Sequence, residues 1–163
     1  MGEARVTESV GAASGSRWRS IFSRRPRPGP VLGDEIMRGY AQVALDLLAR
    51  WEELHECWLV ALDEQRRTER LANAAAVYRW QLNAVLARFE ALAVPSALRA
   101  WHDALLEALG AASRGTHLLS HGYRFHIVRT ICDGGLLLEE AREQEQAART
   151  ALQSAVSLSA GAA

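Results

Sequence analysis

Apolar residues recur at steps of three and four positions through most of the chain after Asp34. This spacing places them on one face of an α-helix, so it predicts amphipathic helices that bury their apolar faces. The first apolar stripe fades in the polar run 63–68 and comprises Ile36, Tyr40, Val43, Leu47, Trp51, Leu54, Trp58 and Leu62. The second stripe ends before Pro95 and comprises Leu71, Ala75, Tyr78, Leu82, Val85, Phe89 and Leu92.

Two further stripes follow Pro95, which stops the second helix because the residue before a proline avoids the α-helical region. Ser96 is expected to cap the third helix, and Gly122 is expected to mark the turn that follows it. The third stripe comprises Leu98, Trp101, Leu105, Leu109, Ala112, Thr116 and Leu119. The fourth stripe comprises Ile127, Ile131, Gly134, Leu138, Ala141, Ala148 and Leu152.

Two adjacent glycines, Gly134 and Gly135, fall within the fourth stripe. A glycine inside a helix costs about 1 kcal/mol relative to alanine. We expect the helix to continue, because the apolar period runs through the pair and glycines allow a neighbouring backbone to approach closely. The alternative is a break at Asp133.

Four long helices joined by short turns favour antiparallel neighbours. The length of 163 residues suits a single domain. The predicted fold class is therefore all-α, an antiparallel up-down-up-down four-helix bundle over residues 34–157. Residues 158–163 are rich in serine, alanine and glycine, and we expect this tail to fray.

Residues 1–33 differ from the rest of the chain, because they are poor in apolar residues and contain prolines at 26, 28 and 30. We expect them to form a disordered Arg/Pro-rich N-terminal arm. Within it, three apolar residues would share one face of a short helix surrounded by arginines. We interpret this part as a partner-binding segment made of Arg17, Trp18, Arg19, Ile21, Phe22, Arg24 and Arg25.

The formal net charge is zero, but it is unevenly distributed. Residues 1–33 carry six arginines and two glutamates, which gives +4, whereas residues 34–163 carry 13 arginines and 17 acids, which gives −4. These opposite charges suggest that the arm folds back onto its own bundle until a partner displaces it.

The cellular compartment follows from what the sequence does not contain. Two cysteines, Cys57 and Cys132, do not make a disulfide framework, which indicates a reducing, cytoplasmic environment. No run reaches the roughly 18 apolar residues of a transmembrane helix. The N-terminus lacks the apolar region of a secretory signal.

A proline between two helices, a histidine soon after it and an alanine-rich last helix form a weak motif. It is carried by Trp80, Pro95-Ser96-Ala97-Leu98-Arg99-Ala100-Trp101-His102-Asp103-Ala104-Leu105-Leu106-Glu107-Ala108-Leu109, Gly122 and Leu138-Glu139-Glu140-Ala141. In these features, which cover about half of its length, the chain resembles small uncharacterised bacterial helical-bundle proteins. The resemblance implies the fold and no activity.

The histidines and cysteines offer a candidate metal site. His117 and His121 lie one helical turn apart, a spacing that can chelate a transition metal. The bundle topology brings Cys57 and Cys132 toward the same end, although each cysteine lies beside a core position, where cysteine usually acts as a small apolar filler. The helical register also points both histidines toward solvent. The four candidate ligands are His117, His121, Cys57 and Cys132.

Catalytic patterns are missing from the sequence. Glu52 and His55 have the spacing of a di-iron ligand pair, but no second copy of that pair exists. The sequence contains no phosphate-binding loop and no nucleophile motif. We therefore expect no enzymatic activity and no cofactor.

The leading hypothesis is a non-enzymatic interaction or accessory protein that docks to a protein partner or larger assembly through its arm. The alternative is a metal- or small-ligand-binding bundle that uses the His/Cys end. Homo-oligomerisation stays open, because an exposed tryptophan in the bundle would indicate an interface. Contact of the arm with nucleic acid or an anionic membrane also stays open.

Overall fold

The computed structural model describes residues 35–160, with side chains through residue 157. This part of the chain forms four α-helices and one 3-10 helix: α2 (Glu35–Glu64), α3 (Thr68–Glu90), η1 (Ser96–Leu98), α4 (Arg99–Phe125) and α5 (Val128–Ala160). The predicted arm, residues 1–33, lies outside the described residues. Helix α5 continues past the predicted end of the bundle at residue 157.

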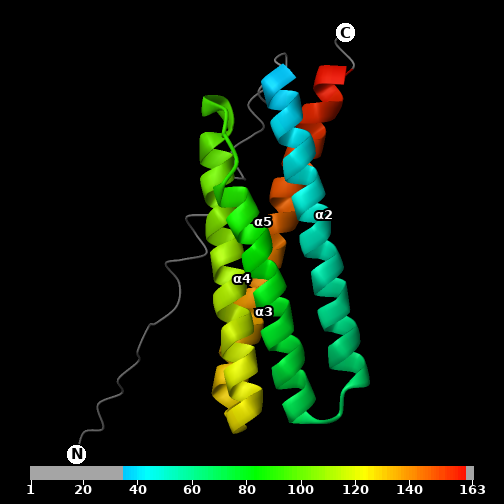
Figure 1. The fold of residues 1–163 in the computed structure, drawn as a ribbon, viewed down its shortest axis with the longest axis vertical. Helices are drawn as coiled ribbons and strands as arrows, with labels where there is room; N and C mark the ends of the chain where they lie inside the picture. Colours follow the sequence, from blue (N-terminus) through cyan, green and yellow to red (C-terminus); the bar gives the residue numbers. More distant parts are fainter. Residues whose placement is uncertain (1–34, 161–163) are drawn as a thin grey trace, which may run out of the picture.

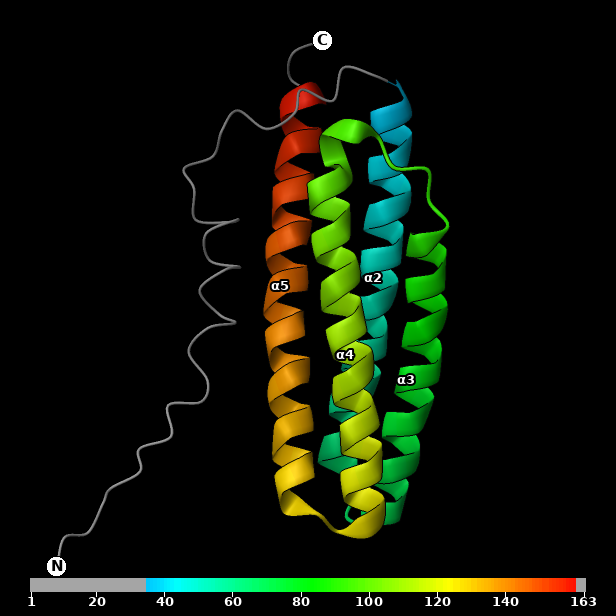
Figure 2. The ribbon, with the colours of Figure 1, turned by 90° about the vertical axis from the view of Figure 1, so that its left-hand side faces the viewer.

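Successive helices run in opposite directions along one long axis, as Figures 1 and 2 show. Each helix packs against its neighbours in sequence, and α2 also packs against α5. The prediction of an all-α, antiparallel up-down-up-down four-helix bundle is thereby confirmed. No helix within residues 35–160 contains a stretch apolar enough to cross a lipid bilayer.

Large side chains from all four helices meet in one core. The second predicted stripe is buried from Leu71 to Phe89, and the third is buried except for the half-buried Trp101. Burial of each large apolar side chain stabilises the fold by roughly 1.5–3 kcal/mol. The largest apolar side chains that are completely buried are Trp51, Phe89, Leu48, Leu82, Leu105, Leu109 and Leu152.

The stripes predicted for α2 and for the start of α5 are partly wrong. Four of their positions are exposed instead of buried, namely Ile36, Val43, Leu62 and Ile127. In α2 the burial falls on a neighbouring set of positions that includes Ala41, Ala44 and Leu48. Apolar residues occupy more than one face of this helix, so only its packing against α3 and α5 decides which face is covered.

The turn between α4 and α5 does not lie at Gly122, contrary to prediction. Gly122 is buried inside α4, where a Cβ atom would lie 2.7 Å from Cγ1 of Ile131. The helix ends at Phe125, and His126 adopts the left-handed conformation with a φ of 57°. The amide of Ile127 then donates to the Gly122 carbonyl oxygen at 2.9 Å. This is a Schellman-type ending with histidine where glycine is usual.

Helix α5 runs unbroken through Gly134 and Gly135, so the continuous helix is confirmed and the break at Asp133 is wrong. A Cβ atom on Gly134 would lie 2.7 Å from the carbonyl oxygen of Gly115 in α4, and a Cβ atom on Gly115 would lie 2.8 Å from the Gly134 oxygen. These two glycines therefore let the backbones of α4 and α5 touch. Gly135 has nothing within 4 Å of its Cβ position.

The start of the third helix also differs from prediction. Helix α3 ends at Glu90, before Pro95, as expected. Ser96 does not cap α4, because it begins the 3-10 helix η1 instead. The N-cap position of α4 is Leu98, which makes no side-chain capping hydrogen bond.

Candidate functional site

A buried cluster of charged side chains connects α5 to α2. The carboxylate of Glu145 is completely buried. It accepts hydrogen bonds from Nη1 of Arg142 at 2.7 Å and from Nε of Arg149 at 2.9 Å. Arg149 reaches across to α2, where it pairs with Glu52 and donates to the Leu48 carbonyl oxygen at 2.6 Å. The two arginines and two glutamates balance each other in charge.

Aromatic side chains surround the cluster on the α2 and α3 side. The guanidinium carbon of Arg142 lies 5.6 Å from the ring centroid of Trp51, a cation–π geometry. Trp51 donates from Nε1 to the hydroxyl of Tyr78 at 3.1 Å, and that hydroxyl lies 3.3 Å from Nδ1 of His55. Nε of Arg142 has no hydrogen-bond partner among the described residues. The cluster therefore joins α2, α3 and α5 through one polar network.

Burial and charge shift the pKa values of the titratable groups in this network. Burial, with a smaller contribution from the positive charge of Arg142, lowers the pKa of His55 to about 4. Burial raises the pKa of Tyr78 to about 12. Burial also raises the pKa of Glu145, although the two guanidinium groups act against that shift. At neutral pH the imidazole of His55 and the phenol of Tyr78 are therefore uncharged.

The cluster is built to hold helices together. Each carboxylate oxygen of Glu145 accepts a hydrogen bond from a guanidinium group, Oε2 from Arg142 and Oε1 from Arg149. A buried ion pair often adds little net stability, because the cost of removing the charges from water offsets their attraction. We interpret the network as the feature that sets the register of α5 against α2.

A second buried polar pair lies near the start of α2. The hydroxyl of Tyr40 lies 2.7 Å from Nδ1 of His102, whose side chain is almost completely buried. Burial lowers the pKa of His102 and raises that of Tyr40. Close by, Nε1 of Trp101 donates to the Ala148 carbonyl oxygen at 3.1 Å. These contacts tie α2 to α4 and α4 to α5 at that end of the bundle.

The four predicted metal ligands are not brought together. Nδ1 of His117 lies 2.9 Å from a guanidinium nitrogen of Arg79, and the ring of His121 packs against Phe125. Both histidines are exposed, as their helical register predicted. Within residues 35–160, no three His, Cys, Asp or Glu side chains are grouped so that they could hold a metal ion.

The two cysteines also differ from expectation. Cys57 and Cys132 are both exposed free thiols, so the interpretation of them as small apolar fillers is wrong. The predicted partner-binding residues, Arg17 to Arg25, lie outside the described residues. Their contacts therefore stay a prediction.

An exposed apolar stripe on α3 was missed by the sequence reasoning. Trp80 is 73 % exposed and Val77 is 55 % exposed, on the face of α3 opposite its buried residues. Exposed alanines extend the stripe at helical spacing, and they are Ala84, Ala87 and Ala91. Apolar residues at steps of three and four on a second face of α3 were the sequence signal that could have revealed it. We call this surface the α3 stripe.

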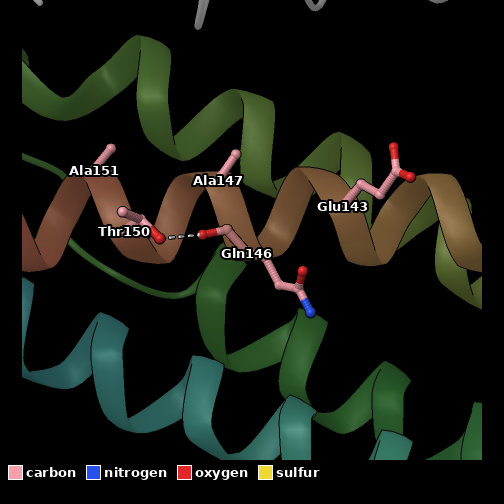
Figure 3. Close-up of a pocket in the computed structure, with 5 residues that line it drawn as sticks. All are labelled: Glu143, Gln146, Ala147, Thr150 and Ala151. Carbon is pink, nitrogen blue, oxygen red and sulfur yellow. Dashed lines mark hydrogen bonds between the residues drawn. The ribbon is translucent and has the colours of Figure 1, made fainter.

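Two hollows occur on the described surface. The first, of about 520 Å³, lies along the outer side of α5, and Figure 3 shows Ala147 and Ala151 projecting to the same side of it while the Thr150 hydroxyl donates to the Gln146 carbonyl oxygen. The second, of about 460 Å³, lies between the start of α3 and the end of α4. The first is wide open, and no unpaired buried polar atom among the described residues belongs to a residue lining either hollow.

Comparisons of the chain with protein-family models, with curated proteins and with solved structures found no match. Any function must therefore be argued from the residues of this chain.

Proposed function

We propose that this protein is a cytoplasmic, non-enzymatic interaction protein that docks to a partner protein through residues 17–25 and the α3 stripe. The observation that carries the proposal is the exposure of Trp80 within the apolar α3 stripe. Tryptophan is among the residues most enriched at energetically important positions of protein interfaces. A large apolar side chain kept in water is otherwise a liability, because it promotes nonspecific association.

The charges around the α3 stripe favour a partner with an acidic surface. Exposed Arg70 and Arg88 flank the stripe, and residues 65–90 carry five arginines against two glutamates. Residues 17–25 add four arginines and no acid. Complementary charges accelerate association and suppress incorrect partners. The partner that fits is a protein with an apolar pocket bordered by carboxylates.

The interior of the bundle supports a non-enzymatic role. Its buried titratable side chains are engaged with one another, as in the pairs Glu145–Arg149 and Tyr40–His102. Buried groups held in mutual hydrogen bonds contribute to the packing of helices. The exposed side of the molecule is then where recognition takes place.

Site-specific photo-crosslinking tests the proposal. A photoreactive phenylalanine analogue is placed at position 80 of the full chain, and in a second sample at position 153, where exposed Gln153 lies on α5. We expect one acidic protein to crosslink at position 80 and not at position 153. Its yield should fall at high salt, because salt screens charge attraction.

A full-chain variant in which Arg17, Arg19, Arg24 and Arg25 become Gln serves as the matched test of the arm. It should lower the yield at position 80 at least several-fold. Equal crosslinking at both positions, or an unchanged yield in the arginine variant, would contradict the proposal. A crosslink to a second copy of this chain would replace it with self-association.

A further inference from the structure

The last two turns of α2 lack the covering that the rest of the helix receives from α5. Arg149 of α5 contacts Glu52 and the Leu48 carbonyl oxygen in the middle of α2, and in Figure 1 the two helices separate from there toward the end of α2. Leu59 lies two turns after Glu52, the residue that pairs with Arg149 of α5, so it faces the same side. It is nevertheless 49 % exposed, and Leu62, one turn after buried Trp58, is 37 % exposed.

Helix α5 has a matching uncovered position. Gly135 lies two turns before Arg142, which packs on Trp51 of α2, so Gly135 also faces α2. Nothing lies within 4 Å of its Cβ position, although the adjacent Gly134 is tightly packed against α4. Apolar positions that face one another across α2 and α5 are thus left uncovered at this end of the bundle.

The uncovered part of α2 is strongly acidic. Residues 51–64 contain five acids and no arginine, and the acids are Glu52, Glu53, Glu56, Asp63 and Glu64. Three of them, Glu56, Asp63 and Glu64, are exposed and have no ion-pair partner among the described residues. We call the surface formed by Leu59, Leu62, Glu56 and Asp63 the α2 patch, which excludes Glu64 because residues two positions apart on a helix face different sides.

We propose that residues 17–25 of the same chain dock on the α2 patch and cover it when no partner is present. Trp18, Ile21 and Phe22 would pack on Leu59 and Leu62. The arginines around them would pair with Glu56 and Asp63. Docking of residues 17–25 does not depend on the proposed function. Only its consequence does, which is that binding of a partner must release these residues from the α2 patch.

The charge and the apolar residues of segment 17–25 make it the occupant that fits the α2 patch. Residues 17–25 carry four arginines and no acid, whereas residues 51–64 carry a charge of −5. The helical α3 stripe is flanked by arginines, so it would repel the same segment. Docking removes apolar surface from water on both sides, and it brings opposite charges into a partly desolvated site where their attraction is stronger.

The length of the chain allows this contact. Phe22 precedes Glu35, the first residue of α2, by 13 positions. At about 3.1 Å per residue in the extended conformation that prolines favour, this connection reaches about 40 Å. Leu59 follows Glu35 by 24 positions, which at 1.5 Å per residue places it about 36 Å along the helix.

Paramagnetic NMR on the full chain tests the proposal directly. A nitroxide is attached to exposed Cys132, three residues before Gly135, in a chain carrying Cys57→Ser. We expect it to broaden the amide signals of residues 17–25 strongly in low salt. The broadening should disappear near 1 M salt, where charges are screened beyond about 3 Å. A nitroxide at position 114 of α4, introduced as Arg114→Cys in a chain without other thiols, should leave these signals sharp.

Two double variants separate local from general charge effects. Glu56→Gln with Asp63→Asn should reduce the broadening at least several-fold. Glu69→Gln with Glu107→Gln removes the same charge from α3 and α4 and should leave it unchanged. Equal effects of the two variants, or no broadening from Cys132 in the parent chain, would overturn the proposal.

A mixed sample distinguishes the occupants. Isotope-labelled chains without nitroxide are combined with unlabelled chains that carry it. Broadening in this mixture would show that a second copy supplies the segment, which overturns docking within one chain. No partner protein is present in these measurements, so their outcome is independent of the crosslinking at position 80.

Discussion

The fully buried carboxylate of Glu145 accepts a hydrogen bond from Nε of Arg149 at 2.9 Å, and the same arginine pairs with Glu52 on α2. One guanidinium group therefore connects the acids of two helices. Helix α5 can meet α2 in only one register if all of these bonds are to form. A shift by one turn would break the contacts of Arg149 with Glu52 and with the Leu48 carbonyl oxygen of α2, whereas Glu145 would keep its partners because they lie on α5 itself.

Replacement of this carboxylate should be strongly destabilising. Glu145→Ala leaves the guanidinium of Arg142, which is 8 % exposed, without its ion-pair partner. Removal of one member of a buried pair typically costs about 3–5 kcal/mol. Urea unfolding followed by circular dichroism measures this loss. The control Glu139→Gln, at an exposed position of α5, should change the free energy of unfolding by less than about 0.5 kcal/mol. Similar losses in the two variants would contradict the role of the cluster.

The two adjacent glycines of α5 should respond to alanine in opposite directions. Gly134→Ala places a methyl group 2.7 Å from the Gly115 carbonyl oxygen, and such overpacking costs about 1–3 kcal/mol. Gly135→Ala meets nothing within 4 Å and should stabilise the helix by about 0.5–1 kcal/mol. Chemical denaturation of both variants decides the matter. Stabilisation by Gly134→Ala would show that α4 and α5 do not touch at this point.

Two tryptophans offer a matched comparison of buried and exposed positions. Trp51 is completely buried, and Trp51→Ala should destabilise the bundle by about 3–5 kcal/mol. Trp80 is 73 % exposed, and Trp80→Ala should alter stability by about 0.5 kcal/mol or less. Urea midpoints of the two variants provide the test. A large loss in Trp80→Ala would mean that the α3 stripe is covered within the isolated protein.

The stability of the bundle should depend on pH through His55. Its pKa in the folded protein is lowered to about 4 by burial and by Arg142, whereas an unfolded histidine has a pKa near 6.5. Between these two pKa values the unfolded chain binds more protons than the folded chain, so the free energy of unfolding rises with pH. The contribution of His55 to stability is therefore complete above about pH 6.5 and is lost as the pH falls to about 4.

Unfolding in urea at several pH values measures this slope. The variant His55→Gln should flatten the profile within that window. A remaining part is expected from His102, whose pKa burial also lowers. An unchanged slope in His55→Gln would show that this imidazole is not held neutral by its surroundings.

Much of the fold was predictable because helical periodicity is a local property. The stripes of α3 and α4 indicated their buried residues well, and these two helices pack extensively against each other, whereas α2 packs only sparsely against α5. The stripe of α2 was less informative: Ile36, Val43 and Leu62 had the right spacing but are exposed. The turn between α4 and α5 was predicted at Gly122, but Gly122 lies inside α4, where it allows close packing against Ile131. His126 takes the left-handed conformation that ends the helix.

The candidate sites were harder to foresee. Spacing suggested His117 and His121 as ligands, yet distance along a helix does not reveal what a second helix places nearby, and Arg79 occupies that position. Nothing local distinguished Glu145 from the exposed acids of α5. Its two arginine partners lie at helical spacing on α5 itself, but only the packing of α5 against α2 decides that this face is buried.

By itself the sequence determined the helices, their order and antiparallel arrangement, and the division of charge between residues 1–33 and the bundle. These follow from residue type and spacing, which act over a few neighbouring positions. Only the tertiary structure decided which acid is buried, which glycine touches a backbone, and that α5 leaves Leu59 and Leu62 uncovered. Those outcomes depend on distances between helices, and such distances are set by the packing of all four together.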